Sequence, residues 1–493
     1  MTAPSPELLG AVDLGSNSFR VEIGRVDGNR IVSQSYWKET IRLAGGFDEH
    51  GALTPEAQTR ALGALSRFHE RLEGIPKSRI RAVGTQALRA ATNAAEFLPK
   101  AEAALGVPID ILSGHEEARL VYRGCIHSLP PSSSRRLILD IGGASTEVVI
   151  GKGLDVERCE SFRMGCVNTS LRFFADGKIT AKRFKKAVIS CSALLEEGER
   201  TFSSDLYEEA FGSAGTFGAI SDVCMALGWS DGVVRREHLQ ELSRILIEAG
   251  DVRKVEFDGL KADRREVIAG GLAVLTAVFE TLGISAMRPV RGGLRVGLLY
   301  DLLGRVSNQD ARDVAVDGML DALRCDRHQA RRVSDLALGF YRALVPNASP
   351  EACKLLERST LLHEVGMAIS SSHYHRHSSY IIANADLSGF SRQEQETMAA
   401  AALAQRGNLG KVKAMLGSCI SEEAVLAVRL AVILAHARTD RLWPNFATIA
   451  VKDGFEVRFP TDWLEAHPLT DYLLQDEAEC WAKIGRSVRF PAL

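Results

Sequence analysis

Short apolar runs alternate with amphipathic stretches over residues 8 to 120 of the chain. The short runs predict strands near residues 10–14, 19–26, 30–36, 80–84 and 108–112. A helix is predicted after Thr54, a good N-cap residue that is followed by Pro55, which suits the first helical position. Ala61, Leu65 and Phe68 then recur at helical spacing. Strands that alternate with helices are typical of an α/β domain.

The same alternation returns at residue 137 and continues to about residue 304, which predicts a second α/β domain. Residues 307–440 are rich in Ala, Leu and Arg at helical spacing and predict an all-helical domain. Near the C-terminus, strand-like runs at Phe446–Val451 and Phe455–Phe459 flank Lys452-Asp453-Gly454, which is typical of a hairpin turn. We therefore predict four domains, over residues 8–120, 121–304, 305–443 and 444–493, the last a small α+β domain.

Two stretches of the α/β region share one local sequence pattern. The first runs from Leu9 to Gly24 and the second from Leu137 to Gly151. Each is an apolar strand, an Asp-x-Gly turn with small hydroxyl residues, and a second apolar strand. When they are aligned on Asp13 and Asp140, they match without a gap, which indicates a duplicated fold.

The turns of this repeat have the residue types of a phosphate site. Glycine lets the backbone approach a ligand closely, successive turn N–H groups form a concave anion site, and Ser and Thr add neutral donors. The aspartate at the strand end can hold a cation or a water against the anion. Asp-x-Gly turns also occur in ordinary hairpins, but two in matched register favour loops that close on one phosphate chain. The candidate phosphate-binding residues are Gly15, Ser16, Asn17, Ser18, Gly142, Gly143, Ser145 and Thr146.

Composition argues against several classes of protein. The 493 residues carry a formal net charge of −2, and no basic patch is interleaved with aromatic residues as nucleic-acid stacking requires. Nine cysteines without regular spacing indicate reduced thiols rather than a disulfide framework or a zinc site. The N-terminus has no basic segment followed by an apolar run, and the apolar stretches are too short to cross a bilayer. We therefore expect a soluble cytoplasmic protein.

A candidate general base lies in the segment Ser113-Gly-His-Glu116-Glu117. With Ser113 as N-cap, Glu116 is the third helical residue, so a capping box accounts for Glu116. Glu117 is not needed for capping, and a carboxylate at a helix start near two phosphate loops can take a proton from an attacking water. It can equally complement the helix dipole or pair with an arginine. The residues alone leave both roles open.

Two further segments place small polar residues at the end of a predicted strand. Arg89 lies one turn into the helix after Thr85, where it either contacts a phosphate or is solvated. The segment Phe211–Gly218 supplies Gly215 and Thr216 ahead of a helix that we expect to start near residue 219. Helix N-termini bind anions, although a single turn of small residues is weak evidence.

Histidines and basic residues form the remaining candidates. Four histidines between residues 363 and 377 suggest a metal, but the His-Asp pair of helical metal phosphohydrolases is missing, so the motif is degenerate. We favour a polar patch in which Arg376 and His377 contact phosphates, with structural histidines as the alternative. Lys182 and Arg183 head a basic helix, and charge runs usually mark a solvated face. For a long polyanion, these four residues are a candidate polyphosphate track.

Taken together, these motifs resemble the exopolyphosphatase / guanosine pentaphosphate phosphatase family of the actin-like ATPase superfamily. They extend over nearly the whole chain in the family's order, at Ala11–Ser18, Gly84–Arg89, Ser113–Leu120, Asp140–Glu147, Arg163–Cys166, Leu362–Gly366 and His375–Ser378. The resemblance implies duplicated actin-like (RNase H-like) α/β domains with an interdomain cleft. It also implies an all-helical HD-like domain and a small α+β C-terminal domain.

The resemblance makes Glu117 the general base that activates water. Asp140, Glu147 and Asp13 would hold Mg²⁺, with K⁺ as a further cation, and Arg89 would contact phosphate. A homodimer is also implied. We predict an exopolyphosphatase that releases orthophosphate from the ends of inorganic polyphosphate. The alternative is hydrolysis of guanosine pentaphosphate to the tetraphosphate, or both at one site, and a non-catalytic sensor of either ligand is a third hypothesis that Glu117 disfavours.

The chain departs from the family pattern in two places. Ala144 stands where the family commonly has a third glycine, and its methyl group either narrows the phosphate pocket or fits if φ is negative. In Val290–Gly297, two acids of the family pattern are replaced by Arg291 and Val296. A more positive field there suits a long polyanion and disfavours a contact with a nucleotide ribose.

Overall fold

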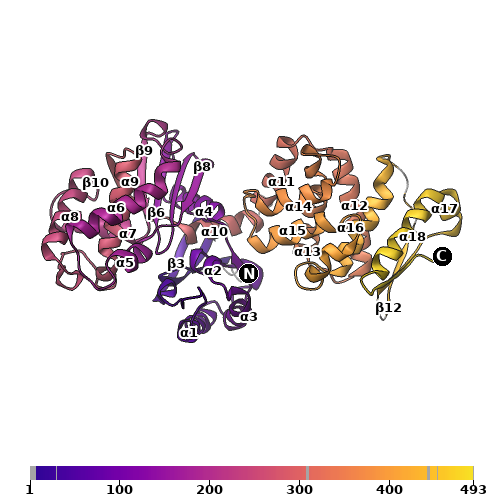
Figure 1. Cartoon of the computed structure of the whole chain (residues 1–493), viewed down its shortest axis with the longest axis horizontal. Helices are drawn as coiled ribbons and strands as arrows, with labels where there is room; N and C mark the ends of the chain where they lie inside the picture. The colour runs from indigo at the N-terminus through magenta and orange to yellow at the C-terminus, as the bar shows by residue number, and fades with distance from the viewer. Residues whose placement is uncertain are drawn as a thin grey trace, which may run out of the picture. The chain divides into compact units, whose positions relative to one another are not determined.

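The computed structural model describes residues 7–28, 30–306, 310–440, 443, 445–451 and 454–491. The chain divides into two units, Met1–Asp310 and Ala311–Leu493 (Figure 1). The first unit contains both α/β domains, and the second contains the remaining helices and a small sheet. No described helix has the length and apolar composition needed to cross a membrane.

The first sheet confirms the strands predicted between residues 10 and 112. Its order is β3-β2-β1-β4-β5, and β1 pairs antiparallel with β2 and parallel with β4. The strands are β1 (Leu8–Leu14), β2 (Ser18–Asp27), β3 (Arg30–Thr40), β4 (Ile80–Gly84) and β5 (Ile109–Ile111). The helices are α1 (Pro55–Arg71), α2 (Gln86–Ala90), α3 (Ala94–Leu105) and α4 (Gly114–His127). Thr54 caps α1 as predicted, because its hydroxyl accepts a hydrogen bond from Ala57 N at 3.3 Å.

The second sheet repeats this topology. Its order is β10-β11-β9-β6-β7-β8, and β6 pairs antiparallel with β7 and parallel with β9, as β1 does with β2 and β4. The strands are β6 (Arg135–Ile141), β7 (Thr146–Lys152), β8 (Asp155–Phe162), β9 (Glu209–Ser213), β10 (Val234–Arg235) and β11 (Ala286–Pro289). The helices are α5 (Cys166–Phe173), α6 (Ala181–Leu195), α7 (Ala214–Ala226), α8 (Arg236–Ala249), α9 (Ile268–Thr281) and α10 (Leu294–Val306). The predicted duplication is therefore present in the fold.

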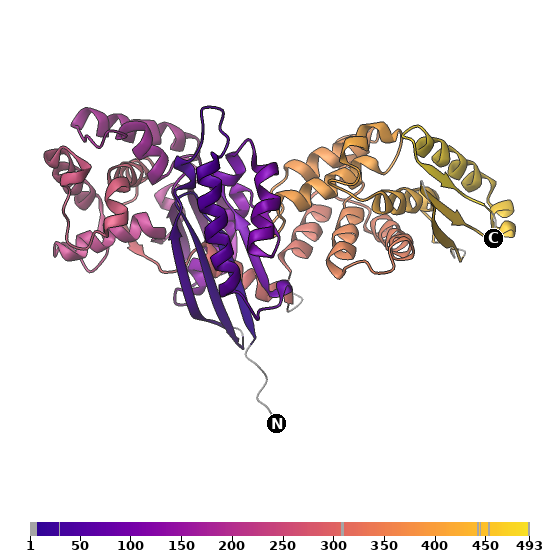
Figure 2. The same cartoon turned by 90° about the horizontal axis from the view of Figure 1, so that it is seen from below.

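Helices α4 and α10 fill an apolar layer that both sheets share. Side chains alternate between the two faces of a strand. On β1, Val12 and Leu14 pack with α1 and α3, whereas Leu9 and Ala11 pack with α4, α10 and Ile138 of β6. Figure 2 shows helices of the first domain across the indigo strands of the first sheet. The domain boundary predicted at residue 120 falls inside α4, because this helix belongs to the shared core.

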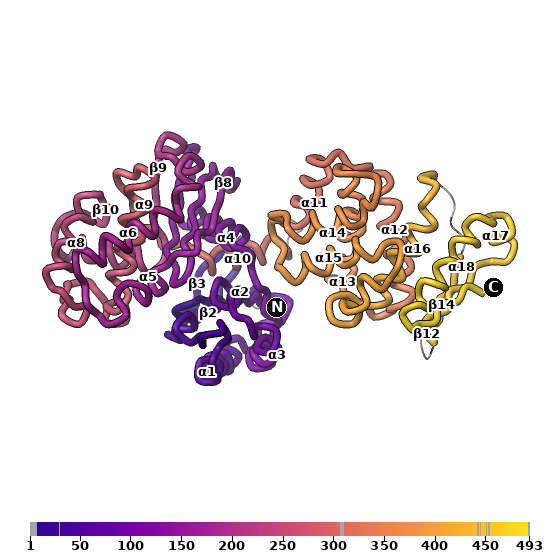
Figure 3. The backbone as a smooth tube through the Cα atoms, viewed as in Figure 1, coloured from indigo at the N-terminus to yellow at the C-terminus, as the bar shows by residue number. Residues whose placement is uncertain are grey.

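The second unit is helical up to its C-terminal part, as predicted. Its helices are α11 (Ala311–Ala322), α12 (Arg327–Leu344), α13 (Pro350–Leu361), α14 (Tyr374–Asn384), α15 (Arg392–Ala404) and α16 (Glu422–Leu434). Along the chain these precede β12 (Ala447–Val451), β13 (Gly454–Arg458), α17 (Thr461–Ala466), α18 (Pro468–Ala482) and β14 (Ser487–Arg489), which can be followed in Figure 3. β12 and β13 pair antiparallel and confirm the predicted hairpin, while Lys452 and Asp453 of its turn lie outside the described residues.

The small sheet shares its core with these helices. Phe455 of β13 and Trp481 of α18 belong to the same apolar cluster as Phe340 of α12. A buried ion pair adds to this contact, because Arg429 of α16 donates two hydrogen bonds to Glu477 of α18, at 2.5 and 2.6 Å. The boundary predicted between residues 443 and 444 therefore divides elements that pack as one unit.

We expect Trp481→Ala to destabilise the helices of the second unit together with the small sheet. Trp481 is completely buried in their common core, and a truncation of this kind costs about 3–5 kcal/mol of unfolding free energy. Hydrogen exchange should become faster in α16 as well as in β13. The control is Leu469→Ala, at a side chain on the same helix that is 69% exposed, with an expected change below ~0.5 kcal/mol. Faster exchange confined to the small sheet would contradict a shared core.

Candidate active site

The two Asp-x-Gly turns lie against each other. The first connects β1 to β2, and the second connects β6 to β7. A Cβ atom on Gly143 would lie 3.2 Å from Ser16 Cβ and 3.3 Å from Asn17 N, so the loops approach closely there. The structure thus brings together the two loops that the sequence repeat singles out.

Carbonyl groups of the first loop are held by the segment that follows β3. Asn17 O accepts hydrogen bonds from Ile41 N and Arg42 N at 3.1 and 2.8 Å, and Ser16 O accepts one from Ala44 N at 2.9 Å. In a trans peptide the C=O and N–H groups point in opposite directions. The N–H group that follows each of these carbonyls therefore points away from that segment.

Carbonyl groups of the second loop are held in the same way by the start of α5. Gly142 O accepts from Cys166 N at 3.0 Å, and Gly143 O accepts from Val167 N at 2.8 Å. Gly165 permits this approach, since a Cβ on it would lie 2.5 Å from Gly143 C and O. Both loops thus direct consecutive N–H groups away from their supporting segments, which is the arrangement of a concave anion site.

The other residues of the second loop fit without strain. Ala144 is buried and is not among the described non-glycine residues with a positive φ, so its methyl group needs no unusual backbone. Ser145 O accepts from Gly142 N at 2.9 Å and closes the turn. Thr146 is completely buried, and its hydroxyl donates to Met164 O at 2.7 Å. The Thr146 hydroxyl therefore donates its hydrogen within the protein and not to a ligand.

The two loops differ in the charge that faces their aspartate. Asp13 pairs in register with Arg20, whereas Asp140 pairs with Glu147. Arg20 Nη1 lies 3.8 Å from Asp13 Oδ2, and Arg295 Nη1 from α10 lies 3.9 Å from the same oxygen. Neither Arg20 nor Arg295 is among the site residues predicted from the sequence. The alignment of the two repeats contained a signal for Arg20, which takes the position of Glu147, but nothing local pointed to Arg295.

Glu117 lies in the first turn of α4, as predicted. Ser113 Oγ accepts from Glu116 N at 3.1 Å, which confirms the N-cap. The Glu117 side chain is buried, and its Oε2 accepts from Arg89 Nη1 and Nη2 at 3.2 and 3.3 Å. Arg89 also donates to Leu112 O at 2.6 Å. Arg89 therefore holds the Glu117 carboxylate in place, and the phosphate contact predicted for it stays a prediction.

The carboxyl groups of the site have raised pKa values. Burial raises the pKa of Glu117 to about 7, against the pull of Arg89 and with a contribution from the charges of Asp13 and Asp140. Burial also raises the pKa of Asp140 to about 6, and it raises that of Asp13 although two arginines oppose the shift. The pKa of Glu147 lies well above its ordinary value because of burial and the charges of Glu117 and Asp140. These groups therefore gain from any cation that enters the site.

The donor set fits a Mg²⁺ ion that shares its coordination with a substrate. In the part of the chain that the structure describes, no group of three or more His, Cys, Asp or Glu side chains is arranged to hold a metal ion. Mg²⁺ is usually held by one or two carboxylates together with waters and substrate phosphates. Asp140 and Glu147 lie opposite each other on β6 and β7, and Ser161 Oγ donates to Glu147 Oε1 at 2.8 Å. Mg²⁺ at Asp140, Glu147 and Asp13, and K⁺ as a further cation, remain predictions.

The segment with Gly215 and Thr216 differs from the expected loop. α7 begins at Ala214 rather than near residue 219, so both residues lie in its first turn. A Cβ on Gly215 would lie 1.9 Å from Arg264 Nη2, which shows that the Arg264 side chain covers this helix end. The glycines suggested a loop, but Phe217 is completely buried in the core of the second domain and keeps the segment helical.

Two of the four histidines predicted as a site, His363 and His375, are buried in the second unit, whereas His373 is exposed. His363 is 1% exposed, its ring Nδ1 hydrogen bonds to Thr360 O at 2.7 Å, and burial lowers its pKa. Burial and nearby basic side chains lower the pKa of His375 to about 4. On the same helix, α14, Arg376 is exposed and His377 is half-buried, so the predicted phosphate patch involves these two residues and stays a prediction.

Lys182 and Arg183 lie in the first turn of α6. Lys182 is exposed, and Arg183 makes a two-point ion pair with Asp176, at 2.5 and 3.1 Å. Arg183 also lines a surface hollow of about 310 Å³ together with Arg172 and Lys186. This surface carries positive charge, and its role as a polyphosphate track remains a prediction.

The family of this chain follows from its similarity to known proteins. Residues 25–306 match the Ppx/GppA phosphatase family, and residues 311–478 match domain III of Ppx/GppA phosphatases. The chain belongs to the Ppx/GppA phosphatase family. It is 36% identical over 488 residues to the guanosine-5'-triphosphate,3'-diphosphate pyrophosphatase of Pseudoalteromonas translucida, with 98% of both chains covered. It is also 36% identical over 490 residues to the protein of the same name from Aeromonas hydrophila, again with 98% coverage of both.

Solved structures support the actin-like fold of this Ppx/GppA chain. An exopolyphosphatase from Cytophaga hutchinsonii matches with a TM-score of 0.55 and 21% identity, over 60% of this chain and 97% of that one. An exopolyphosphatase-like protein matches with a TM-score of 0.53 and 24% identity, over 60% and 98% of the two chains. At these identities the likeness concerns the fold, and it confirms the duplicated actin-like α/β architecture that the motifs implied.

We expect Glu117→Gln to stabilise the protein at high pH but not at low pH. The pKa of Glu117 rises from 4.5 to about 7 on folding, so the folded protein binds this proton more tightly and its stability falls as pH rises through that interval. The variant has no charge to bury, and its unfolding free energy should exceed that of the wild type by about 1–3 kcal/mol near pH 8. Calorimetry near pH 4, where both side chains are neutral, should give equal Tm values. A Tm difference independent of pH would show that the carboxylate is not the source.

Proposed function

We propose that this protein hydrolyses the terminal phosphoanhydride bond of guanosine-5'-triphosphate,3'-diphosphate and releases orthophosphate. The observation that carries the proposal is Glu117, a buried carboxyl group with a pKa of about 7 that interacts with the aspartates of both phosphate loops. Relatives that match over 98% of both chains bear the name of this activity. They support the nucleotide alternative of the sequence analysis better than its main hypothesis, an exopolyphosphatase.

The proposed reaction is attack of water on the terminal phosphorus atom. Glu117 takes a proton from the water as a new P–O bond forms, and the bond from that phosphorus to the bridging oxygen breaks. The bridging oxygen leaves with the electron pair on the shortened nucleotide. A pKa of about 7 is suited to this role, because the group is partly ionised at neutral pH and still basic enough to accept the proton. Arg89 keeps the carboxylate oriented through its two hydrogen bonds.

The substrate phosphates would lie between the two loops. The outward-facing N–H groups of both loops and the hydroxyl groups of Ser16, Ser18 and Ser145 are the proposed donors, since preorganised donors stabilise the charge of the transferred phosphoryl group. Asp140 and Glu147 are the residues that would hold Mg²⁺, which when bound neutralises phosphate charge and favours departure of the leaving group. The homodimer and the cytoplasmic location implied by the sequence remain predictions.

Replacement of the proposed base separates catalysis from binding. We expect Glu117→Gln to lower kcat for guanosine pentaphosphate by about 10²–10⁴-fold, because the amide cannot accept the proton of water. The Kd of guanosine pentaphosphate, measured by calorimetry, should change little, since both phosphate loops are intact. Release of phosphate at the wild-type rate would reject Glu117 as base, and loss of binding would assign it to the binding site.

Inorganic polyphosphate is a second candidate substrate because of Arg291. This side chain is exposed and directly precedes Gly292 and Gly293, and a Cβ on Gly293 would lie 3.9 Å from Asp140 Oδ2. An extra positive charge beside the site attracts a long polyanion. The measurement that decides between the two substrates is phosphate release, with and without Mg²⁺. It compares guanosine pentaphosphate with long polyphosphate.

We expect Arg291→Asp to lower kcat/KM for polyphosphate by roughly tenfold through the loss of electrostatic attraction, with a smaller effect on guanosine pentaphosphate. Arg200→Asp makes the same charge change at an exposed position of the same unit and serves as the control. Unchanged hydrolysis of both substrates by the Arg291 variant would remove this argument for polyphosphate.

A further inference from the structure

Helices α4 and α10 connect the proposed base to the second phosphate loop. They lie side by side in Figures 1 and 3 and pack in one apolar cluster. α4 carries Glu117 in its first turn, and α10 follows Gly292 and Gly293 directly. Ser213 Oγ donates to Gly292 O at 2.9 Å, and Gly293 lies beside Asp140. The spacing of the two helices therefore sets how far the base lies from the second loop.

The two helices touch through their backbones near the site. A Cβ on Gly124 of α4 would lie 2.0 Å from Gly293 O and 2.6 Å from Gly297 N. A Cβ on Gly297 of α10 would lie 1.9 Å from Leu120 O. Glycine at both positions lets the backbones approach more closely than any side chain would allow, so the contact fixes the separation of the helices but supplies no polar bond to hold their register.

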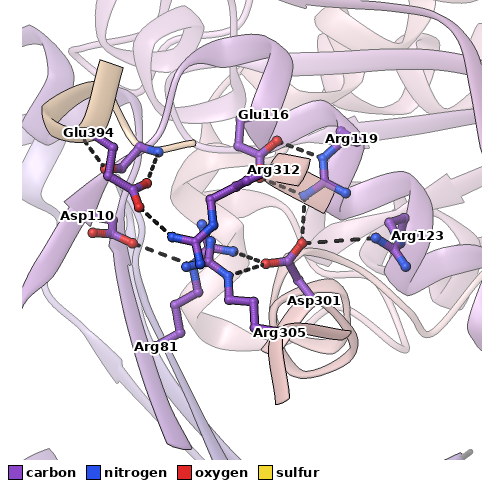
Figure 4. Close-up of polar contacts among 10 residues, drawn as sticks. Arg81, Asp110, Glu116, Arg119, Arg123, Asp301, Arg305, Arg312 and Glu394 are labelled. Carbon is purple, nitrogen blue, oxygen red and sulfur yellow. Dashed lines mark hydrogen bonds and ion pairs between the residues drawn. The ribbon is translucent and has the colours of Figure 1, made fainter. Parts of the chain in front are cut away.

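A buried network of ion pairs further along α10 provides polar bonds between the two helices (Figure 4). Asp301 of α10 is 3% exposed and accepts from Arg119 of α4 at 2.8 Å, from Arg81 of β4 at 2.5 Å and from Arg305 at 3.0 Å. Arg119 also donates two hydrogen bonds of 2.7 Å to Glu116, the neighbour of Glu117. The Asp301 carboxylate of α10 is thus bonded to β4 directly and, through Arg119 and Glu116, to the first turn of α4.

The position of these bonds distinguishes them from ordinary surface ion pairs. Arg119 lies two residues after Glu117 in the same helix, and both of its partners, Glu116 and Asp301, are buried. Charge-assisted hydrogen bonds inside a protein hold a defined geometry, because an unpaired buried charge is strongly disfavoured. A shift of α10 along α4 therefore has to break these bonds.

We propose that Asp301 is a positioning residue, which through Arg119 and Glu116 holds the first turn of α4 so that Glu117 stands in line with the water and the terminal phosphate. The inference rests on the proposed function, since it takes Glu117 as the base. Asp301 touches neither substrate nor water in this scheme. Its removal leaves the phosphate loops intact but lets α4 move, and displacement of a reacting group by about 1 Å can lower a rate by 10²-fold.

The test is Asp301→Asn, which keeps the shape of the side chain and removes its charge. We expect kcat for guanosine pentaphosphate to fall by about 10- to 100-fold, while KM stays close to the wild-type value. The decisive measurement is the double variant with Glu117→Gln. Because Asp301 is inferred to act through Glu117, the double variant should be no slower than Glu117→Gln alone. A further loss of the same factor in the double variant would show a general structural effect and overturn the inference.

Glu477→Gln is the matched control, since it removes a carboxylate that is equally buried and paired with Arg429 in the second unit. It should lower Tm as Asp301→Asn does and leave kcat unchanged. Should Asp301→Asn fail to fold, Arg119→Gln removes the link from Asp301 to Glu116, while Arg81 and the more distant Arg123 of α4, at 4.0 Å, still pair with Asp301. It carries the same expectation for kcat and for the double variant.

Failure of this inference differs from failure of the proposed function. An inactive Glu117→Gln enzyme together with wild-type kcat in Asp301→Asn and Arg119→Gln rejects the positioning role alone. Wild-type turnover in Glu117→Gln rejects the base, and the positioning role with it.

Discussion

The first unit is organised around a desolvated group of carboxylates. Asp13, Glu117, Asp140 and Glu147 come from four different elements, and all are buried. Burial of a carboxyl group disfavours its charged form, and each charge nearby adds to the cost. The structure offsets this cost only in part, with Arg89 on Glu117 and with Arg20 and Arg295 near Asp13. The remaining repulsion leaves Glu117 basic enough to accept a proton, and it leaves Asp140 and Glu147 able to gain from a cation.

A second buried charge cluster in the same unit has the opposite balance. Asp301 accepts hydrogen bonds from Arg81, Arg119 and Arg305. Although burial raises the pKa of Asp301, these arginines outweigh it and hold the pKa well below its ordinary value. A carboxylate with so low a pKa is ionised at neutral pH and is a poor proton acceptor there. The excess of anions in one cluster and of cations in the other explains why the pKa values of buried acids in one fold shift in opposite directions.

Much of the fold could be predicted because its signals are local. The strands of both sheets have apolar runs, the caps Thr54 and Ser113 begin their helices, and the repeat around Asp13 and Asp140 recurs in the topology of both sheets. The local signals failed where packing overrides composition. Gly215 suggested a loop, yet the burial of Phe217 makes its segment the start of α7.

The sequence by itself determined the two Asp-x-Gly turns, the helix start that carries Glu117, and the family, because each depends on residues that are neighbours in the chain. The tertiary structure decided what these residues face. Arg89 holds Glu117 instead of lying in solvent. Arg295 lies beside Asp13 although the two residues are at opposite ends of the sequence of the first unit. The raised pKa of Glu117, which suits the proposed base, depends on burial and on distant charges. Electrostatic energy depends on distance in space and on the exclusion of water, and neither can be read from the order of residues along the chain.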